Sequence, residues 1–476
     1  MGLIGAGKFG SMFLSQIRRT PGMCLLGVAD LSPDRARNSL NRVGWPKEQY
    51  SATSFDEARK NGTTYIVDNA DDLIAAEGLD VVVDATGHPA AGIRHAQAAV
   101  RYGRHIVMVN VEADVLAGPL LAKQARDAGL HYSMAYGDQP ALIAEMVDWA
   151  EAAGFEVVCA GKGTKYLPQY HTSTPDTVWS YYGFSEEQVA SGDFNAQMFN
   201  SFLDGTKSAI EMAAVANATG LGVPSDGLKF PPCGVDDIPT LLRPASDGGM
   251  LERKGMVEVI SSLERDGRPV FKDLRWGVYC VFEAPSDYVQ QCFAQYGMQT
   301  DSTGRYGAMF KPYHLIGLEL GISVANIMLR GEATGSIRGF SGDAVSTSKR
   351  DLKAGEVLDG EGGFMVYGKL MPAADSLACG GLPIGLAHGA KLKRDVAKGK
   401  AVCWSDIEFD PNQDAVRVRR EMEDMFAGQK CPSTSRKTQL GHGVVPMTCR
   451  PHSGLMATLF RASVPPDQLS NRQPDW

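Results

Sequence analysis

The feature that most constrains this chain is a glycine-rich turn close to its first residue. The run Gly5-Ala6-Gly7-Lys8-Phe9-Gly10 follows a short apolar segment and precedes an apolar-periodic one at 12–17. A strand-like segment, 24–30, then ends in Asp30. A strand, a glycine turn, a helix, a second strand and an acid about 20 residues on form the pattern of a dinucleotide-binding βαβ unit. An unrelated α/β glycine turn is the alternative.

Each glycine of the run has a physical role in that unit. Gly5 permits the tight turn, Gly7 lets the backbone approach a pyrophosphate, and Gly10 lets helix and strand pack closely. The free N–H groups and the dipole at the helix amino terminus bind the phosphates. We therefore expect residues 5–10 and Asp30 to contact a dinucleotide. Because only four residues precede Gly5, we expect a short first strand or a start upstream of Met1.

The choice between NAD and NADP stays open. Asp30 favours a ribose 2′-hydroxyl and hence NAD. Arg35 and Arg37 follow closely and favour a 2′-phosphate instead.

Strand and helix patterns alternate up to residue 140. Further strands are expected at 81–84, 105–110 and 132–136, with helices at 91–102 and about 116–128. Carboxyl ends of parallel strands lie beside the cofactor in such sheets. The residues expected there as cofactor contacts are Thr86, Gly87, His88 and Asn110. For His88, a turn residue is an equal alternative. We predict an α/β fold with a Rossmann dinucleotide-binding domain over 1–140.

The residues that we expect to carry the chemistry follow this domain. A strand at 157–161 leads into Lys162-Gly163-Thr164-Lys165. Hydride delivery to a carbonyl needs a nearby proton donor, because negative charge builds on the oxygen. We predict that Lys165 polarises this oxygen and shuttles its proton, and that Lys162 binds a substrate anion. Two solvated surface lysines are the alternative.

A helix is expected over 197–219, and it is apolar on nearly every side. Its polar residues, Asn200, Asp204, Lys207 and Glu211, recur every three or four positions and so share one stripe. Buried charges must be paired or face a polar cavity. We interpret the stripe as an active-site wall. Asp204 and Glu211 would orient hydroxyls or a cation, with Lys207 as charge partner. A solvent-facing ion-pair ladder is the alternative.

His314 stands where an apolar helix, 315–328, is expected to begin, and it is an acid/base candidate. A capping or core histidine is equally compatible. The acidic loop 231–237 favours a surface turn over a cation site. Because there is no dense Cys/His cluster, we expect no zinc site, while a weak divalent cation site of Asp and Glu stays open.

Composition excludes several classes of protein. The 476 residues carry a net charge of −8 and lack a long basic run, which disfavours nucleic acid and anionic membranes as partners. No apolar stretch is long enough for a transmembrane helix. Nine scattered cysteines without a CxxC pair are typical of reduced thiols, so we expect a cytoplasmic protein.

The carboxyl-terminal third changes to short strands and glycine turns. Residues 351–358 and 395–402 are similar, which predicts a small β module of two halves within 346–428. The remainder, 429–476, is rich in Ser, Pro, Arg and Gln, and we expect it to be disordered.

Four motifs together carry a family resemblance. The glycine turn, Gly137-Asp138-Gln139-Pro140, the run 162–168 (KGTKYLP) and the run 311–315 (KPYHL) resemble homoserine-dehydrogenase-like oxidoreductases with a terminal SAF domain. Over residues 1–427 the chain is most similar to the 1-deoxy-D-xylulose 5-phosphate reductoisomerase-like (DRL) group. The resemblance implies a catalytic and dimerisation domain of α+β type over 141–345, a SAF β-clip, a homodimer and a role in isoprenoid biosynthesis. Homoserine dehydrogenases carry an Asn-Lys pair where this chain has Asn110-Val111-Glu112.

These observations predict an NAD(P)-dependent oxidoreductase of EC 1.1.1 type. Its substrate would be a small, anionic carbonyl or hydroxyl compound, such as a sugar phosphate. One alternative is a hydroxy-acid dehydrogenase of the homoserine dehydrogenase type. Another is a non-catalytic dinucleotide-binding regulator or assembly protein that uses the SAF module for binding.

Overall fold

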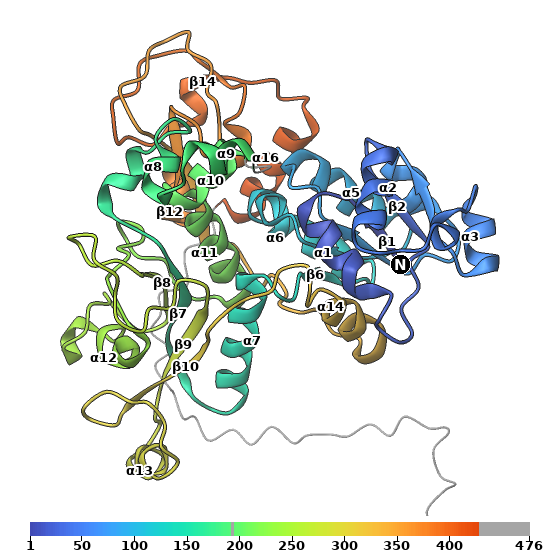
Figure 1. Ribbon diagram of the computed structural model, residues 1–476. Coiled ribbons are helices and arrows are strands. Elements are labelled where there is room, and N and C mark those ends of the chain that lie inside the picture. The colour runs from blue at the N-terminus through green and yellow to red at the C-terminus, as the bar shows by residue number, and fades with distance from the viewer. Residues whose placement is uncertain (192–194, 428–476) are drawn as a thin grey trace, which may run out of the picture. The chain divides into compact units, whose positions relative to one another are not determined.

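The computed structural model describes residues 1–191 and 195–427 (Figure 1). The predicted disorder of 429–476 concerns residues outside this part. The described residues belong to one compact unit and contain two larger sheets.

The first sheet is parallel throughout and has the strand order β3-β2-β1-β4-β5-β6. Its strands are β1 (Gly2–Ile4), β2 (Gly27–Ala29), β3 (Tyr65–Val67), β4 (Val81–Asp84), β5 (His105–Met108) and β6 (Tyr132–Met134). Its helices are α1 (Lys8–Ile17), α2 (Pro33–Arg42), α3 (Phe55–Asn61), α4 (Ala70–Ala75), α5 (Pro89–Arg101) and α6 (Val111–Asp127). This is the order of a Rossmann fold, and the predicted α/β class is confirmed.

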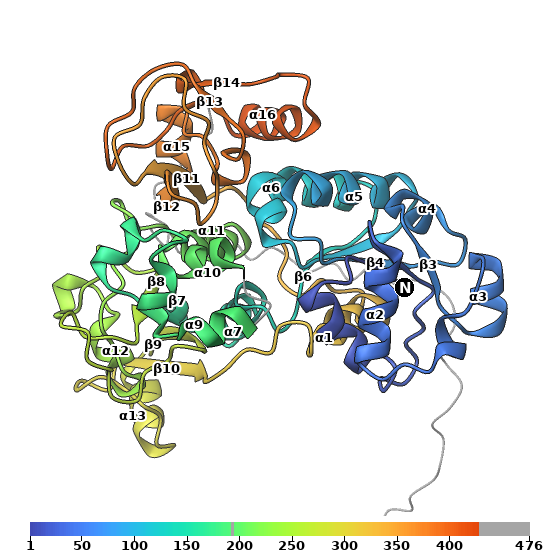
Figure 2. The same cartoon turned by 45° about the horizontal axis from the view of Figure 1, so that its top comes forward.

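Helices cover both faces of this sheet. Figure 2 shows α5 and α6 on one face and α1 and α2 on the other. Successive residues of each strand point to opposite faces of the sheet. Ile4 and Val82 enter the cluster under α5 and α6, whereas Leu3 and Val83 enter the cluster under α1. The short strand β3 was missed by the sequence reading.

The second sheet is mixed, with the order β10-β9-β7-β8. Its strands are β7 (Glu156–Thr164), β8 (Met256–Ser261), β9 (Val278–Glu283) and β10 (Tyr306–Lys311). Only β7 and β8 run parallel. The helices α7 (Gln139–Ala152) and α11 (Thr206–Thr219) pack on one face, and α12 (Ile238–Leu241) lies toward the other (Figure 1). The prediction of an α+β domain beside the Rossmann domain is confirmed to this extent.

Short elements complete this region. The remaining helices before the C-terminal third are α8 (Val178–Tyr182), α9 (Glu186–Ser191), α10 (Ala196–Leu203), α13 (Asp287–Gln295) and α14 (Gly321–Ala325). Helical turns of 3-10 type lie at Lys47–Tyr50, Pro168–Thr172, Val235–Asp237 and Ala245–Asp247.

Two segments that were predicted as continuous helices are broken in the structure. The segment 197–219 is two helices, α10 and α11, because the chain turns at Asp204 and Gly205. Gly205 has a φ of +92°, which favours glycine, and it caps α11. The segment 315–328 begins as turns, continues as α14 and ends in a π-helical turn, Asn326–Arg330.

The C-terminal region has short antiparallel pairs. They are β11 (Gly342–Ser348) with β12 (Val366–Pro372), and β13 (Lys391–Leu392) with β14 (Ile407–Glu408). Leu352 and Val396 pair with each other, which brings together the two similar segments seen in the sequence. The expected domain boundary at 345/346 falls inside β11. The assignment of this region to the SAF domain remains a prediction.

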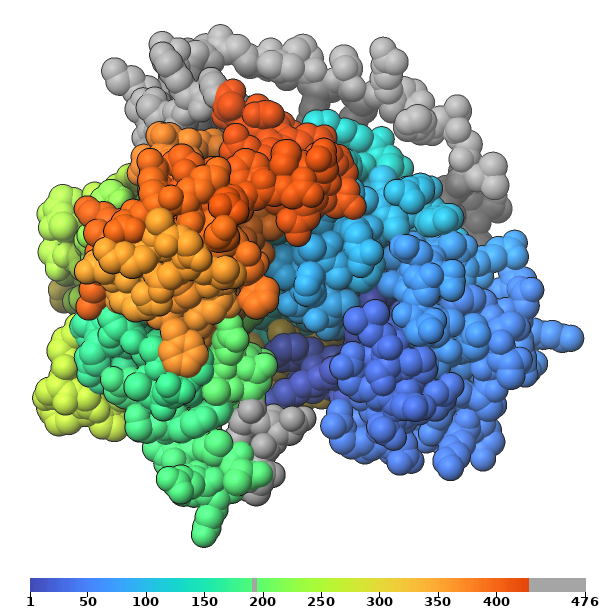
Figure 3. Space-filling view, turned by 90° about the horizontal axis from the view of Figure 1, so that it is seen from above, coloured from blue at the N-terminus to red at the C-terminus, as the bar shows by residue number. Residues whose placement is uncertain are grey.

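The last described helix joins this region to the Rossmann fold. The region also contains α15 (Ala373–Cys379), 3-10 turns at Ile384–Leu386 and Trp404–Asp406, and finally α16 (Asp414–Phe426). Buried Arg419 of α16 donates to the Leu116 carbonyl of α6 at 3.3 Å and pairs with Asp343 of β11 at 2.6 Å. Figure 3 shows the red residues of α16 against the light-blue and cyan residues of α5 and α6.

Over residues 1–191 and 195–427, no helix has both the length and the apolar character that crossing a membrane requires. The cysteines of the same part are all free.

Candidate functional site

The glycine turn has the shape that a dinucleotide needs. Gly5 has a φ of +93°, and a Cβ on it would lie 2.8 Å from the Ala85 carbonyl oxygen. A Cβ on Gly10 would lie 2.2 Å from the Gly5 oxygen, so neither position accepts a side chain. Gly7 faces open space and begins α1 without a side-chain cap or an acid in the first turn. The N–H groups at the start of α1 are therefore free to receive a pyrophosphate.

The remaining residues of the turn differ in exposure. Lys8 is exposed, Phe9 is half-buried, and Ala6 is buried. The Ala6 N–H donates to Asp30 Oδ2 at 2.9 Å, which ties the glycine turn to the end of β2.

Asp30 is already saturated with donors. Its Oδ1 accepts from the Ser32 N–H at 2.9 Å, and the Arg35 guanidinium pairs with the carboxylate at 2.5 Å. Its side chain is 1% exposed, whereas that of Arg35 is 56% exposed. The group that faces solvent at the end of β2 is therefore the guanidinium.

The loop after β4 is ordered by Asn110. Its amide nitrogen donates to Thr86 Oγ1 at 3.2 Å and to the His88 carbonyl at 2.9 Å, and its Oδ1 caps α6. Asn110 is buried, whereas Gly87 and His88 are exposed. The imidazole of His88 caps α5. Asn110 thus positions the loop, and the exposed face of the loop is formed by residues 87–88.

Four titratable side chains, from β7, from α11, from the turn after β6 and from the segment after β10, lie near one another. We name Lys162, Glu211, Asp138 and His314 the Lys162 cluster. Lys162 of β7 and Glu211 of α11 form an ion pair, and their side chains are only 6% and 8% exposed. Asp138 follows β6 at the carboxyl edge of the parallel sheet and caps α7 through the Gln139 N–H at 2.9 Å. The cluster therefore adjoins the edge at which the cofactor residues lie.

Asp138 is the most perturbed acid of this cluster. Burial, together with the negative charge of Glu211, raises the pKa of its carboxyl to about 7, although the Gln139 N–H and Lys162 oppose the change. A carboxyl group that titrates near neutral pH can exchange protons during a reaction.

His314 faces the same pair. Its Nδ1 donates to the Trp276 carbonyl at 2.7 Å, so Nε2 carries the free lone pair. Burial lowers the pKa of His314, and the positive charge of Lys162 lowers it further. His314 is therefore a neutral acceptor at physiological pH.

The segment after β10 connects this cluster to the cofactor helix. Lys311 pairs with Glu319 at 2.8 Å and lies 5.4 Å from the ring centroid of Tyr136. A Cβ on Gly137 would lie 2.8 Å from the Leu315 oxygen, and one on Gly317 would lie 2.8 Å from the Phe9 oxygen of α1. The chain from 311 to 320 thus runs beside both the Asp138 turn and α1.

The predicted polar stripe divides into two parts, because α10 and α11 are separate helices. On α11, Lys207 and Glu211 keep their one-turn spacing, but Lys207 pairs with Glu112 at the start of α6 and lies 3.7 Å from Glu361. It partners neither Asp204 nor Glu211, so the expectation of one shared stripe is wrong.

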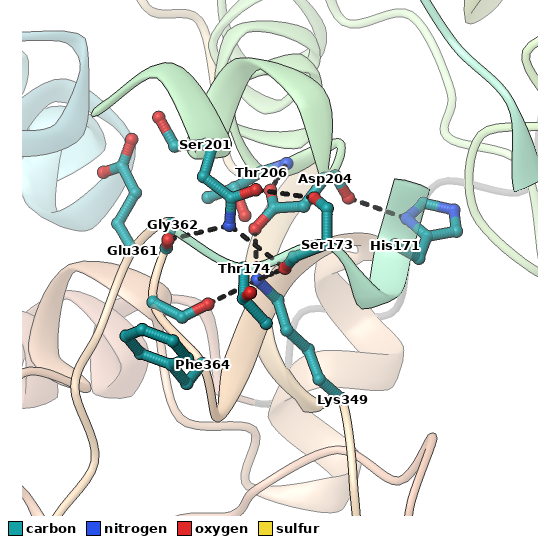
Figure 4. Close-up of polar contacts among 12 residues, drawn as sticks. His171, Ser173, Thr174, Ser201, Asp204, Thr206, Lys349, Glu361, Gly362 and Phe364 are labelled. Carbon is teal, nitrogen blue, oxygen red and sulfur yellow. Dashed lines mark hydrogen bonds and ion pairs between the residues drawn. The ribbon is translucent and has the colours of Figure 1, made fainter. Parts of the chain in front are cut away.

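The other part surrounds Asp204 and is named the Asp204 cluster: Asn200, Asp204, Lys349 and the carbonyls of Ser173, Gly362 and Gly363. Figure 4 shows Asp204, Lys349, Ser173 and Gly362 of this cluster. Asp204 is fully buried and pairs with Lys349 at 2.7 Å. The Lys349 ammonium also donates to the Ser173 carbonyl at 2.8 Å and to the Gly363 carbonyl at 2.6 Å. Asn200 joins Ser173 to Gly362. This cluster fastens α10 to the C-terminal region.

Lys165 does not join Lys162. Lys162 lies within β7, whereas Lys165 follows the last residue of this strand, Thr164. Lys165 donates to the Tyr181 carbonyl at 2.5 Å and lies 5.4 Å from the ring centroid of Tyr182.

Sequence reasoning missed Asp138 and Lys349 as members of these clusters. Asp138 had a signal, since it directly follows a predicted parallel strand within a recognised motif. Lys349 had no such signal, because its partner is 145 positions earlier in the chain.

In the described ranges, no group of three or more His, Cys, Asp or Glu side chains could hold a metal ion. Asp236 of the acidic loop pairs with Lys272 at 2.8 Å.

Comparison with known families agrees with this division. Residues 5–134 match the NAD-binding domain of homoserine dehydrogenase, and residues 137–320 match the catalytic domain of the oxidoreductase DRL. The chain therefore combines an NAD-binding domain with a catalytic domain like that of the oxidoreductase DRL. The predicted homoserine-dehydrogenase-like and DRL-like parts are confirmed, and neither match reaches the C-terminal region. No curated protein sequence matches the chain.

Several solved structures are similar to parts of the chain at low identity. A probable dehydrogenase from Thermotoga maritima is 13% identical over 70% of this chain and 89% of its own, with a TM-score of 0.36. A scyllo-inositol dehydrogenase from Lactobacillus casei is 11% identical over 71% and 90%, with a TM-score of 0.33. The 1-deoxy-D-xylulose 5-phosphate reductoisomerase from Zymomonas mobilis is 18% identical over 45% and 56%, with a TM-score of 0.30. At these values the likeness supports no conclusion about substrate.

Proposed function

We propose that the protein is an NADPH-dependent oxidoreductase of EC 1.1.1 type that interconverts a carbonyl and a hydroxyl on a small anionic substrate. The observation that carries this proposal is the buried Lys162–Glu211 pair, with Asp138 and His314 beside it, at the edge of a dinucleotide-binding sheet. A sugar phosphate, as in reductoisomerase-like enzymes, is the substrate class that we favour. A homodimer, a cytoplasmic location and a divalent cation remain predictions from the sequence.

The residues present fit the cofactor, since the start of α1 is free and Gly7 faces open space. When bound, the reduced nicotinamide supplies a hydride to the carbonyl carbon. Lys162 donates a proton to the carbonyl oxygen, and Glu211 orients the ammonium group. Asp138 then restores the proton of Lys162, and the free Nε2 of His314 accepts a hydrogen bond from a substrate hydroxyl. A positioned donor of this kind accelerates a reaction by about 10²–10⁴-fold.

The preference for NADPH follows from the end of β2. A ribose 2′-hydroxyl would have to displace donors that already occupy Asp30. The exposed guanidinium of Arg35 offers the bidentate geometry that a 2′-phosphate needs. These contacts support NADPH over NADH.

The decisive experiment measures loss of NADPH absorbance with a panel of phosphosugars, including deoxyxylulose phosphate, and hydroxy acids. We expect turnover with a phosphosugar, and a loss of about 10²–10⁴-fold in Lys162→Met with unchanged NADPH binding. Lys254→Met is the matched control. Lys254 also pairs with acids of this sheet, Glu156 and Glu283, but these acids lie at the end of the sheet away from Lys162.

Each alternative has its own outcome. A non-catalytic regulator binds NADPH and turns over nothing in the panel. Turnover of homoserine instead of phosphosugars supports the hydroxy-acid dehydrogenase alternative and removes the reductoisomerase-like substrate class.

A further inference from the structure

Gly163 allows two cationic side chains, those of Lys165 and Arg275, to come near each other. A Cβ on Gly163 would lie 1.9 Å from the Leu274 oxygen and 3.0 Å from the Arg275 nitrogen, and the Gly163 N–H donates to the Gly277 carbonyl at 3.0 Å. Strand β7 and the turn 274–277 therefore meet backbone to backbone, a contact that only glycine permits. The turn carries Arg275 beside Lys165, two positions beyond Gly163.

Neither cation has a carboxylate partner within the described residues. Both are half-buried. Burial lowers the pKa of Lys165, and the positive charge of Arg275 lowers it further. Two partly desolvated cations that repel each other are unfavourable on their own, and an anion between them removes that cost.

Aromatic side chains frame the two cations. The Arg275 guanidinium lies 4.7 Å from the ring centroid of Trp276, and the Lys165 ammonium lies over Tyr182. Burial raises the pKa of the Tyr182 phenol to about 12, while Arg275 opposes this rise. The phenol is therefore protonated at neutral pH and available as a donor.

The same turn reaches the Lys162 cluster. The Trp276 carbonyl, next to Arg275, accepts the hydrogen bond from His314 Nδ1. The motif KGTK thus places Lys162 beside Glu211 and Lys165, just beyond the end of β7, near Arg275.

We propose that Lys165 and Arg275 form a subsite for a phosphomonoester group of the substrate. The planar guanidinium can bind two phosphate oxygens, and the ammonium adds a point charge. This inference rests on the proposed function, because the substrate is the molecule reduced at Lys162. It reverses the roles predicted for the two lysines from sequence: Lys165 binds the anion, and Lys162 moves the proton.

The test is a calorimetric titration of inorganic phosphate into the full-length protein saturated with NADP⁺, so that the glycine turn is occupied. We expect saturable binding that Lys165→Met and Arg275→Gln each weaken about tenfold, or ~1.4 kcal/mol. Arg265→Gln is the matched control, because Arg265 also lies over an aromatic ring, that of Tyr166, and we expect a change below about twofold. Acetate should bind about tenfold more weakly than phosphate.

Folding is checked by NADP⁺ affinity, and Lys165→Arg should restore phosphate binding. Absence of saturable phosphate binding in the wild type, or wild-type phosphate affinity in both variants, overturns the subsite. The proposed function fails separately: phosphate binding without any NADPH turnover in the panel refutes the oxidoreductase proposal but leaves the anion site. Turnover that Lys165→Met leaves unchanged refutes the subsite and leaves the reaction.

Discussion

The Lys162 and Asp204 clusters each contain a buried lysine–carboxylate pair, yet their surroundings differ. Lys349 forms an ion pair with Asp204 and donates hydrogen bonds to two backbone carbonyls. Lys162 has Glu211 as its partner and two titratable neighbours, Asp138 and His314, whose pKa values are displaced in opposite directions. A pair saturated by backbone joins parts of a fold, whereas a pair among titratable groups can move a proton.

The largest expected effect on stability is at the Asp204 cluster. Lys349→Met leaves a fully buried carboxylate without its partner, and breaking such a pair costs about 3–5 kcal/mol. The free energy of unfolding from urea titration measures this loss. Lys353→Met, whose lysine pairs with Asp395 at the surface, is the control and should change it by less than about 1 kcal/mol. An equal loss of unfolding free energy in both variants would contradict the role of the Asp204 cluster in holding α10 to the C-terminal region.

The pH dependence of stability tests Asp138. Because burial raises its folded pKa from 3.8 to about 7, the folded state binds the extra proton, and stability falls as pH rises from about 4 to about 7. Asp138→Asn should remove this fall, about 2 kcal/mol between pH 5 and 7, relative to the wild type. It should also remove the decline in carbonyl reduction above about pH 7 that loss of the Asp138 proton produces. Parallel stability profiles for the two proteins would show that Asp138 does not titrate in this range.

The smallest effect concerns the cofactor. Arg35→Ala should weaken NADPH binding about tenfold, since one bidentate phosphate contact is lost, and leave NADH binding nearly unchanged. Fluorescence titration with both cofactors measures the ratio of their affinities. Arg37→Ala, which breaks only the exposed pair with Asp34, is the control. Equal weakening of both cofactors would mean that Arg35 only supports Asp30.

The sequence predicted those parts of the molecule that depend on local pattern. Gly5, Gly7 and Gly10 define the dinucleotide turn, and Val81–Val83 define a buried strand, because each depends on neighbours within a few positions. The break at Gly205 was missed, since the apolar residues continue across it without a change in period. The pairing of Asp204 with Lys349 and the proximity of Arg275 to Lys165 depend on long-range packing that no spacing reveals.

The central claim is that Lys162, and not the equally buried Lys349, belongs to the catalytic centre. The most direct test compares NADPH consumption per folded molecule in Lys162→Met and Lys349→Met, with NADPH affinity measured on both. We expect a loss of about 10²–10⁴-fold for Lys162→Met and less than about threefold for Lys349→Met. Full turnover in Lys162→Met, or an equal loss in both variants, would contradict it.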